Sequence, residues 1–417
     1  MRENQLIPHL FRSEFSKIVA VLCKTFGLSN IQLAEDITSE TFLKATETWG
    51  LKGVPENPSA WLYHVAKNKA KDYFKREQIF IQKITPELKQ QSLTLKEFEI
   101  DLSEHNIKDS QLQMLFTVCN PIISKEAQIT LALRILCGFG IDEISSALLS
   151  NKSTINKRLH RTKETLRKNK IDLTFPPEKE LMNRLNNVLS VLYLLFNEGY
   201  YSATSEKTLK KDLCIESMRL LYMLLNYEPS NQPQTNALMA LFCFHSSRFE
   251  ARMNPNGEPI LYNEQDKTKW NFELIEKGEF YIKQSSTGNE ITKYHLEALI
   301  AFWHTRTNAD TKEKWENILQ LYNKLIQIEY SPVTALNRTY ALAMAYGKEK
   351  ALKEALKIGL NKNHLYHALL AELYSEINPQ KQVEHLQFAL KMVDTENDKK
   401  VILGKLVKAG KSRYICG

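Results

Sequence analysis

Residues 138–167 read GFGIDEISSALLSNKSTINKRLHRTKETLR, and their pattern indicates the fold more clearly than any other part of the chain. Acidic residues stand at positions 142 and 143, where a helix start favours them. Apolar side chains recur on one helical face, at Ile141, Ile144, Leu148 and Leu149. The polar residues 150–152 interrupt this pattern, and Ser153 is a suitable N-cap for a second helix. The stretch therefore predicts two helices joined by a short turn.

The second predicted helix is strongly basic. Eight Lys or Arg residues lie between positions 152 and 170 with one acid, Glu164. Ile155 and Leu159 fall on the face that points inward. Such a pair of helices predicts a helix-turn-helix, whose second helix enters the major groove of DNA; the alternative is a solvated basic helix. The residues expected to contact bases or phosphates are Ser153, Thr154, Asn156, Lys157, Arg158 and Arg161.

The composition of the whole chain predicts an all-α protein. Its 417 residues include only 14 Gly and 13 Pro, and few segments alternate with a period of two. With 43% hydrophobic residues, the chain can bury the cores of two or three domains. A formal net charge of +8 is compatible with a polyanionic partner such as nucleic acid.

Cysteine usage and hydropathy predict a soluble, cytoplasmic protein. The six cysteines lie far apart without a Cys-x-x-Cys pair, so we expect reduced thiols and neither disulfides nor a zinc site. Charged residues interrupt the apolar positions near the N-terminus, which therefore does not resemble a signal peptide. The longest apolar run, residues 189–196, is too short to span a bilayer, so we expect no membrane partner.

Residues 57–76 read NPSAWLYHVAKNKAKDYFKR and predict a helix that mixes basic and aromatic side chains. This mixture suits an unpaired nucleic-acid strand, because cations follow the backbone and rings accept bases. The alternative is that Trp61 and Leu62 simply belong to the core. The residues expected to contact the strand are Trp61, Tyr63, Lys67, Asn68, Lys71, Tyr73, Lys75 and Arg76.

Residues 34–45 read AEDITSETFLKA and predict an acidic helix. We expect its acids to be exposed beside two apolar side chains, so that this face can dock on a basic protein surface. The alternative is an ordinary solvated face. The residues expected to form the docking face are Glu35, Asp36, Ile37, Glu40 and Phe42.

The chain after residue 177 predicts one helix after another. From Trp315 onward, small and large packing residues recur, and Tyr340 and Tyr374 are one tetratricopeptide period apart. Stacked helix pairs of this kind usually present a concave surface to a protein or peptide. We therefore expect a helical repeat-like domain here, with a protein or peptide regulator as a possible partner.

Two further groups of side chains are candidates for chemistry. His364 and His367 are three residues apart, but no acidic or cysteine partner is near in sequence, so we expect a packing role and no metal site. Glu198, Glu264 and Asp266 are candidates for acid–base catalysis, with a helix cap or a buried ion pair as the alternative. We expect neither enzymatic activity nor a cofactor.

The order of these motifs resembles the extracytoplasmic-function sigma factors, the small sigma-70-type subunits of bacterial RNA polymerase. The acidic helix, the Asn-Pro-x-Ala-Trp-Leu turn and the basic-aromatic helix are similar to sigma region 2, and the helix-turn-helix is similar to region 4. The stretches LFTVCNP (115–121), EAQITLALRILCGF (126–139), VLYLLFNEGYYSA (191–203) and LYNEQDKTKWN (261–271) are similar to the subgroup with a long helical C-terminal extension.

This resemblance implies a role for each part of the chain. Residues 1–78 would be region 2, which binds core RNA polymerase and opens the minus-ten element. Residues 79–108 would be a linker, and residues 109–173 would be region 4, which reads the minus-thirty-five element. Residues 178–417 would be a tetratricopeptide-like extension that regulates activity in cis. The implied partners are core RNA polymerase and promoter DNA.

Two other classes of protein remain open from the sequence. The first is a helix-turn-helix transcriptional regulator that never contacts polymerase, with a helical domain that senses a ligand or peptide. The second is a scaffold in which the helix-turn-helix is only structural. Polymerase binding through the acidic helix distinguishes the sigma factor from both.

Overall fold

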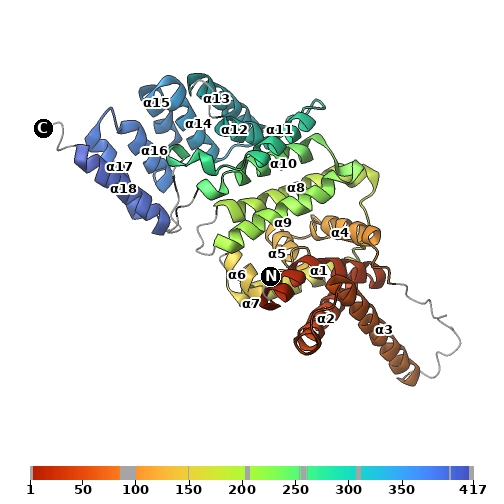
Figure 1. The fold of residues 1–417 in the computed structure, drawn as a ribbon. Helices are drawn as coiled ribbons and strands as arrows, with labels where there is room; N and C mark the ends of the chain where they lie inside the picture. The colour runs from red at the N-terminus through yellow and green to blue at the C-terminus, as the bar shows by residue number, and fades with distance from the viewer. Residues whose placement is uncertain are drawn as a thin grey trace. The chain divides into compact units, whose positions relative to one another are not determined.

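The computed structural model describes residues 3–84, 100–148, 150–201, 207–252, 254, 260, 262–306, 311–393 and 396–412. Within these residues the secondary structure consists of α-helices and short 3-10 helices, without a strand (Figure 1). The all-α prediction is therefore confirmed. The chain divides into two compact units, of which the first holds residues 1–200 and 208–230 and the second holds 201–207 and 231–417.

The first unit begins with a group of three long helices. Phe15, Ile18 and Leu22 are fully buried, as their helical spacing predicts. Gly27 and Gly53 have φ values of 83° and 81°, which glycine adopts without strain, and they follow the first two long helices. The three long helices are α1 (Glu3–Phe26), α2 (Ile31–Lys52) and α3 (Pro58–Ile84), and the short 3-10 helix η1 (Leu28–Asn30) connects the first two.

Four shorter helices follow. Ser103 and Ser124 cap the first two, because each side chain accepts a hydrogen bond from a backbone N–H in the first turn. Of the predicted linker, residues 79–84 belong to α3, residues 104–108 belong to α4, and residues 85–99 lie outside the described residues. The helices are α4 (Glu104–Val118), α5 (Lys125–Ile135), α6 (Ile141–Ala147) and α7 (Lys152–Lys168).

The turn between α6 and α7 corrects one expectation. The N-cap of α7 is Asn151, whose Oδ1 accepts a hydrogen bond from Thr154 N at 2.8 Å, and Ser153 lies inside the first helical turn. Asparagine is as good an N-cap as serine, and it comes first in the chain. The helix therefore begins two residues earlier than a Ser153 cap would place it. Leu149, expected on the apolar face of α6, lies outside the described residues.

Helices from distant parts of the sequence share the core of the first unit. α1 packs against α4 and α5, and Gln111 Nε2 donates to Ser16 Oγ at 2.9 Å in a buried hydrogen bond. Gly138 has a φ of 67°, and a β-carbon added there would lie 3.5 Å from the carbonyl oxygen of Phe11. α2 and α3 extend away from the other helices of this unit (Figure 1).

Two helices of the predicted extension also belong to the first unit. They are α8 (Glu178–Tyr201) and α9 (Lys207–Leu225). Arg184 on α8 donates to the carbonyl oxygen of Phe116 at 2.8 Å, and Arg219 on α9 donates to that of Leu136 at 2.9 Å. The predicted domain boundary at residue 178 thus lies before α8, whereas the first compact unit continues to residue 230. The reason is that α8 and α9 pack on α4 and α5 and complete their core.

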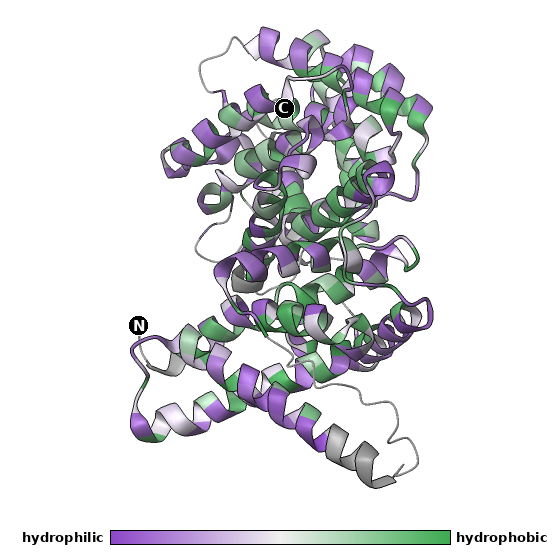
Figure 2. Cartoon of the chain, turned by 90° about the vertical axis from the view of Figure 1, so that its right-hand side faces the viewer, coloured by the Kyte–Doolittle hydropathy of each residue, from purple (hydrophilic) through white to green (hydrophobic). Residues whose placement is uncertain are grey.

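The second unit is a series of helices in which each packs against the next from α12 to α18. Tyr340 and Tyr374, one repeat period apart, pack against the same buried cluster. Green apolar segments gather inside the helical layers in Figure 2. The helices are α10 (Pro233–Ser246), α11 (Phe272–Ser285), α12 (Lys293–Thr305), α13 (Thr311–Ile328), α14 (Pro332–Tyr346), α15 (Lys348–Ile358), α16 (His364–Tyr374), α17 (Pro379–Met392) and α18 (Glu396–Ser412).

The structure also bears on two sequence predictions, the absence of a membrane-spanning helix and the reduced state of the cysteines. None of the described helices has the length and apolar character that a bilayer crossing requires. Five cysteines are buried as free thiols, and burial raises the pKa of Cys119 to about 12. The sixth, Cys416, lies outside the described residues.

The second unit buries a lysine whose partner in the described part of the chain is a phenol and not a carboxylate. Lys314 is 8% exposed, and its Nζ donates to Tyr262 Oη at 2.9 Å, while Tyr262 donates to the carbonyl oxygen of His304 at 2.6 Å. Burial, and then the nearby cations Lys267 and Arg248, lower the pKa of Lys314 to about 8.

We predict that this lysine makes stability rise with pH. Between about pH 8 and 10.5 the folded chain has released the Lys314 proton while the unfolded chain still holds it, so the free energy of unfolding increases with pH. Lys314→Met should remove that part of the increase. Urea unfolding at a series of pH values measures it, with Lys350→Met at an exposed lysine as the control. An unchanged increase in Lys314→Met would contradict this account.

Candidate nucleic-acid interface

The helix α7 separates its apolar and basic side chains onto two faces. Ile155, Leu159, Thr162 and Leu166 are buried at spacings of four, three and four residues, which fix the orientation of the helix. Asn156, Lys157 and Arg161 are exposed on the other side. The helix thus presents amide and guanidinium donors to the exterior, and these are the groups that read base edges and phosphates best.

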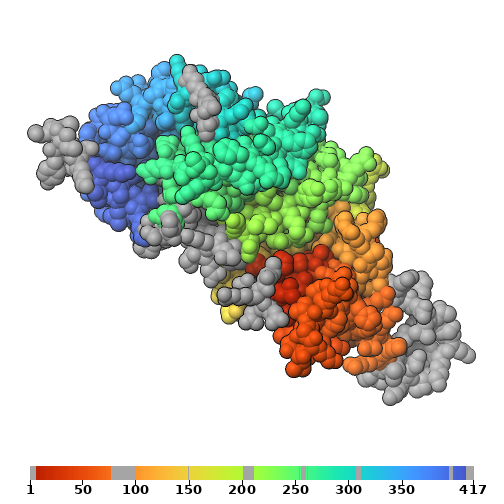
Figure 3. Space-filling model, in the orientation of Figure 1, coloured from red at the N-terminus to blue at the C-terminus, as the bar shows by residue number. Residues whose placement is uncertain are grey.

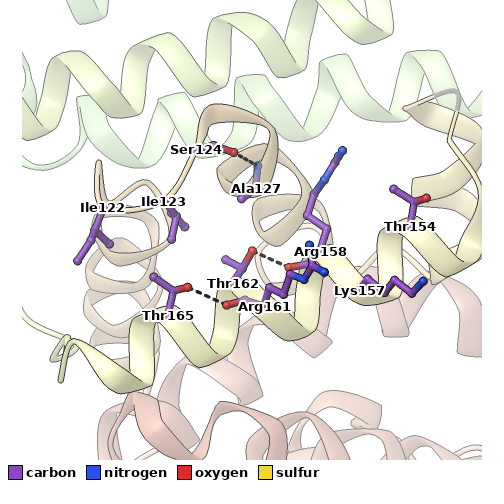
Figure 4. A pocket seen from close by; sticks show the side chains of 10 residues that line it. All are labelled: Ile122, Ile123, Ser124, Ala127, Thr154, Lys157, Arg158, Arg161, Thr162 and Thr165. Carbon is purple, nitrogen blue, oxygen red and sulfur yellow. Dashed lines mark hydrogen bonds between the residues drawn. The ribbon is translucent and has the colours of Figure 1, made fainter.

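A groove of about 470 Å³ lies between α7 and the turn that precedes α5 (Figure 4). Its cationic side chains are Lys157, Arg158 and Arg161, and the described residues that line it include no carboxylate. Arg158 is half-buried, and its Nη1 donates to Thr130 Oγ1 on α5 at 3.1 Å, so its guanidinium is braced against the neighbouring helix. An electropositive groove of this kind favours a phosphate.

The structure brings most of the residues predicted on α7 to this groove. Thr154, Lys157, Arg158 and Arg161 line it together. Asn156 lines a second groove, and Ser153 is exposed at the helix start without lining either. The predicted contacts on α7 therefore form one cluster of four residues with two neighbours beside it.

The basic and aromatic helix α3 also has an exposed basic face. Lys71, Lys75 and Arg76 are exposed, and Tyr73, on another side of the helix from Lys71 and Lys75, is 41% exposed. Asn68 is exposed and bonds to His64 Nε2 at 2.9 Å, while Lys67 is half-buried. Hydrophilic residues (purple) recur along this helix in Figure 2. Its outer half can therefore follow a phosphate backbone.

The two aromatic residues at the start of α3 have intramolecular partners. Trp61 is half-buried and meets Trp49 edge-on, with ring centroids 5.3 Å apart. Tyr63 donates to the Glu14 carboxylate on α1; burial, and then this carboxylate, raise the pKa of its phenol. Tyr63 therefore orients α3 on α1, whereas Trp61 keeps one part of its ring accessible.

The acidic helix α2 exposes a different set of residues from the one expected. Asp36, Ser39, Glu40 and Leu43 are exposed at spacings of three, one and three residues, so they form one stripe on the helix. Leu43 is 59% exposed, whereas the expected apolar members Ile37 and Phe42 are 5% and 4% exposed. Atoms of α2 (orange-red) lie at the surface in Figure 3.

Leu43 is the residue that the sequence reasoning missed on this stripe. It lies seven residues after Asp36, which is a same-face spacing that the sequence already contained. Ile37 and Phe42 attracted attention because they are apolar, but they belong to the core. We call Asp36, Ser39, Glu40 and Leu43 the acidic stripe.

Glu35, also expected on the exposed face, is buried, and that expectation is wrong. The side chain is 3% exposed, and its carboxylate accepts hydrogen bonds from Arg134 Nε at 2.8 Å and from Lys163 Nζ. Lys163 Nζ also donates to Gln32 Oε1 at 2.9 Å. Two cations from α5 and α7 therefore neutralise this acid, beside a groove of about 580 Å³ between α2 and α7.

Two of the remaining candidate residues, His367 and Asp266, have structural partners. His367 is buried and bonds to His385 Nδ1 at 3.0 Å and to the carbonyl oxygen of Asn361 at 2.9 Å. Asp266 accepts hydrogen bonds from Thr268 at the start of a short 3-10 helix, η6 (Lys267–Lys269). Among the described residues, no three His, Cys, Asp or Glu side chains are grouped so that they could hold a metal ion.

We predict that Arg161 contributes to DNA binding through a phosphate. Arg161→Ala should weaken binding of the full chain to duplex DNA, and should reduce the slope of log K against log salt by about 1. Fluorescence anisotropy over a salt series measures both quantities. Lys391→Ala, an exposed lysine of α17 in the second unit, is the control and should leave the slope unchanged. An equal slope in wild type and Arg161→Ala would remove Arg161 from the interface.

Two family models and one other protein match parts of this chain. Residues 10–79 match the family described as Sigma-70 region 2, and residues 184–286 match a family of unknown function, DUF6596. An uncharacterized protein of Rhizobium meliloti (strain 1021) is 31% identical over 352 residues, which are 84% of this chain and 83% of that protein. No solved structure matches the chain. The region 2 match covers the acidic stripe and most of the exposed basic face of α3.

Proposed function

We propose that this chain, which belongs to the family of the Rhizobium meliloti protein, is a sigma factor of the extracytoplasmic-function type that directs RNA polymerase to specific promoters. Its sigma-70 region 2 supports a role in transcription initiation, with core RNA polymerase and promoter DNA as partners. That family also indicates a transcription factor rather than an enzyme. The observation that carries the proposal is the exposed acidic stripe beside the exposed basic face of α3, both within the matched residues.

In this proposal the acidic stripe docks on core polymerase. Asp36 and Glu40 supply negative charge, and Leu43 supplies an exposed apolar side chain at the C-terminal end of the stripe. Charged groups next to an apolar anchor suit a protein interface, because the charges guide encounter and the anchor excludes water. Glu40 Oε2 also pairs with Lys69 Nζ at 2.7 Å, so the stripe is connected to α3.

The helix α3 would then hold the non-template strand at the minus-ten element. Its exposed cations Lys71, Lys75 and Arg76 follow phosphates, and Tyr73 offers a ring on which an unpaired base can stack. Trp61 is the other ring with accessible surface. Each stacked base contributes about 1–3 kcal/mol, which offsets part of the cost of unpairing the duplex.

The helices α6 and α7 would read the minus-thirty-five element as a helix-turn-helix. Asn156 is an exposed donor for base edges, and the groove lined by Lys157, Arg158 and Arg161 accepts the adjoining phosphates. The brace from Arg158 to Thr130 holds one of these cations in place before DNA arrives. Preorganisation of this kind lowers the entropy cost of binding.

The C-terminal extension would regulate the sigma factor in cis. Arg12 on α1 forms ion pairs with Glu143 on α6 and with Asp212 on α9, so α9 contacts the proposed region 2 directly and shares the Arg12 cation with the first helix of the proposed helix-turn-helix. The helix series of the second unit would form the tetratricopeptide-like surface for a protein or peptide regulator. Contacts from α8 and α9 to the rest of the first unit support regulation by this route.

We predict that Asp36→Arg with Glu40→Arg abolishes binding to core polymerase, because two attractive charges become repulsive. Fluorescence anisotropy with labelled chain and purified core polymerase measures binding, and run-off transcription on genomic DNA measures function. Lys69→Gln is the matched control: it removes the same Glu40 ion pair but keeps the acidic stripe, so core binding should persist. Unchanged binding and transcription by the double variant would favour a regulator that does not contact polymerase.

We also predict that a chain ending after Ser230 transcribes at an altered level from the same promoters. This shortened chain keeps α8 and α9, which complete the core of the first unit, and lacks the helix series of the second unit. A cut near residue 175 would instead expose the partners of Arg184 and Arg219. Run-off transcription with core polymerase compares the shortened and full chains. Identical output over a range of chain concentrations would contradict regulation by the second unit.

A further inference from the structure

The second unit gathers positively charged side chains around one tyrosine, Tyr262, which begins the short 3-10 helix η5 (Tyr262–Glu264). Lys314 Nζ lies 5.2 Å from the centre of the Tyr262 ring, and the guanidinium carbon of Arg248 lies 5.5 Å from it. Both cations are buried, with 8% and 9% of their surface exposed. Burial, and then the charges of Lys267 and Arg248, lower the pKa of Lys314 to about 8, so these cations repel one another.

Among the described residues, no carboxylate forms an ion pair with Lys314. Its ammonium group donates to the Tyr262 hydroxyl, and burial raises the pKa of that phenol, so the phenol is neutral. The acids of the neighbouring segment are engaged elsewhere: Glu264 pairs with Lys408 at 3.3 Å, and Asp266 caps η6. The charge of Lys314 is therefore buried without a described counter-charge, which is costly.

Two aromatic residues beside Tyr262 have hydrogen-bonding atoms that no other described residue uses. Trp270 is 3% exposed, and its Nε1 is buried without an acceptor in the described chain. The Nδ1 atom of His304 is likewise buried and unpaired there. The centroids of the Trp270 and His304 rings lie 6.4 Å and 5.0 Å from that of Tyr262. Because buried polar groups are nearly always paired, two such atoms beside one ring indicate a place that takes up a polar molecule.

The surrounding charges favour an anion over water as that molecule. His304 is neutral, because burial, and then Arg248 and Lys314, lower its pKa to about 3. Its imidazole can therefore offer Nδ1–H without adding another positive charge. Lys314 is in the first turn of α13, which begins at Thr311, and a helix start also favours a negative group. Water would pair with the donors, whereas an anion would also compensate the cations.

We propose that this region binds a dianionic oxyanion of the phosphate type, either free phosphate or the phosphate group of a small molecule. We call it the anion site and define it by Arg248, Tyr262, Trp270, His304 and Lys314. The two buried cations would balance the two charges of the dianion, and the N–H groups of Trp270 and His304 would donate to its oxygen atoms. The site lies within the second unit, so this inference goes beyond the proposed roles of the polymerase and DNA surfaces.

The anion site joins four segments of the second unit. Arg248 follows α10, Tyr262 lies in η5, His304 is near the end of α12, and Lys314 is near the start of α13. A ligand that binds only the folded chain stabilises it by mass action. Phosphate should therefore stabilise the packing of these segments, and the second unit would respond to the concentration of the anion.

The indole N–H of Trp270 provides a test that reports on this site alone. The five tryptophans of the full chain are labelled with ¹⁵N, and the resonance of Trp270 is identified by its loss in Trp270→Phe. Inorganic phosphate is added at pH 7, where most of Lys314 is protonated, and at constant ionic strength. We expect the Trp270 resonance to shift until it saturates. Acetate should require about ten-fold or higher concentration, because a monoanion leaves one buried cation unpaired.

A variant of the buried lysine connects the shift to charge. Lys314→Met keeps the apolar stem and removes the ammonium group, and we expect it to weaken phosphate binding about ten-fold or more. Lys350→Met, at an exposed lysine, is the matched control and should bind as the unmodified chain does. Arg161→Ala should also leave the Trp270 shift unchanged, because the groove on α7 attracts phosphate independently. Circular dichroism shows whether each variant is folded.

Two results would overturn the anion site: a Trp270 resonance that phosphate does not move, or an equal affinity in folded Lys314→Met and Lys350→Met. If Lys314→Met does not fold, Arg248→Gln takes its place with the same expectation. Glycerol 3-phosphate distinguishes the two sources, because it binds more tightly than inorganic phosphate only if the natural ligand is a phosphate ester. Neither polymerase nor DNA takes part in these measurements, so their outcome is independent of the proposed sigma-factor activity.

Discussion

The buried carboxylate of Glu35 is the interaction on which the arrangement of the first unit depends. Removing a carboxylate from water is costly, and it is compensated here by two cations, Arg134 and Lys163, that come from different helices. Loss of the carboxylate itself would cost about 3–5 kcal/mol, because it would leave the two partly buried cations without a counter-charge. The position of α2 is therefore coupled to α5 and α7, although about a hundred residues separate them in sequence.

Burial of Glu35 also gives α2 an inward and an outward acidic face. Adjacent helical residues point about 100° apart, so Glu35 turns inward while Asp36 and Glu40 remain at the surface. The inward acid pairs with Arg134 of α5 and Lys163 of α7. The outward acids stay available for a basic partner. One short acidic segment thus packs α2 against α5 and α7 and still keeps two acids at the surface.

Local patterns in the sequence predicted the helices and much of the core, because helical periodicity and caps depend on neighbouring residues. Ile155, Leu159 and Leu166 are buried as their spacing requires. The site was predicted less well, because contacts between residues far apart in sequence decide which of its side chains are buried. Glu35 carries the same local signal as Asp36, and only Arg134 and Lys163, from another part of the fold, distinguish the two. His367 and His385 meet for the same reason.

The extension illustrates why motif order alone is an incomplete guide to domains. The motifs predict a boundary after residue 177, but Arg184 and Arg219 satisfy carbonyl groups at the ends of α4 and α5. Those carbonyl oxygens would otherwise be left partly buried without a donor, which costs about 1–3 kcal/mol each. The first two helices of the extension are therefore part of the scaffold that positions α7. Asp212 of α9 and Glu143 of α6 share one cation, Arg12 of α1, so α9 is linked by charge to the helix that precedes α7.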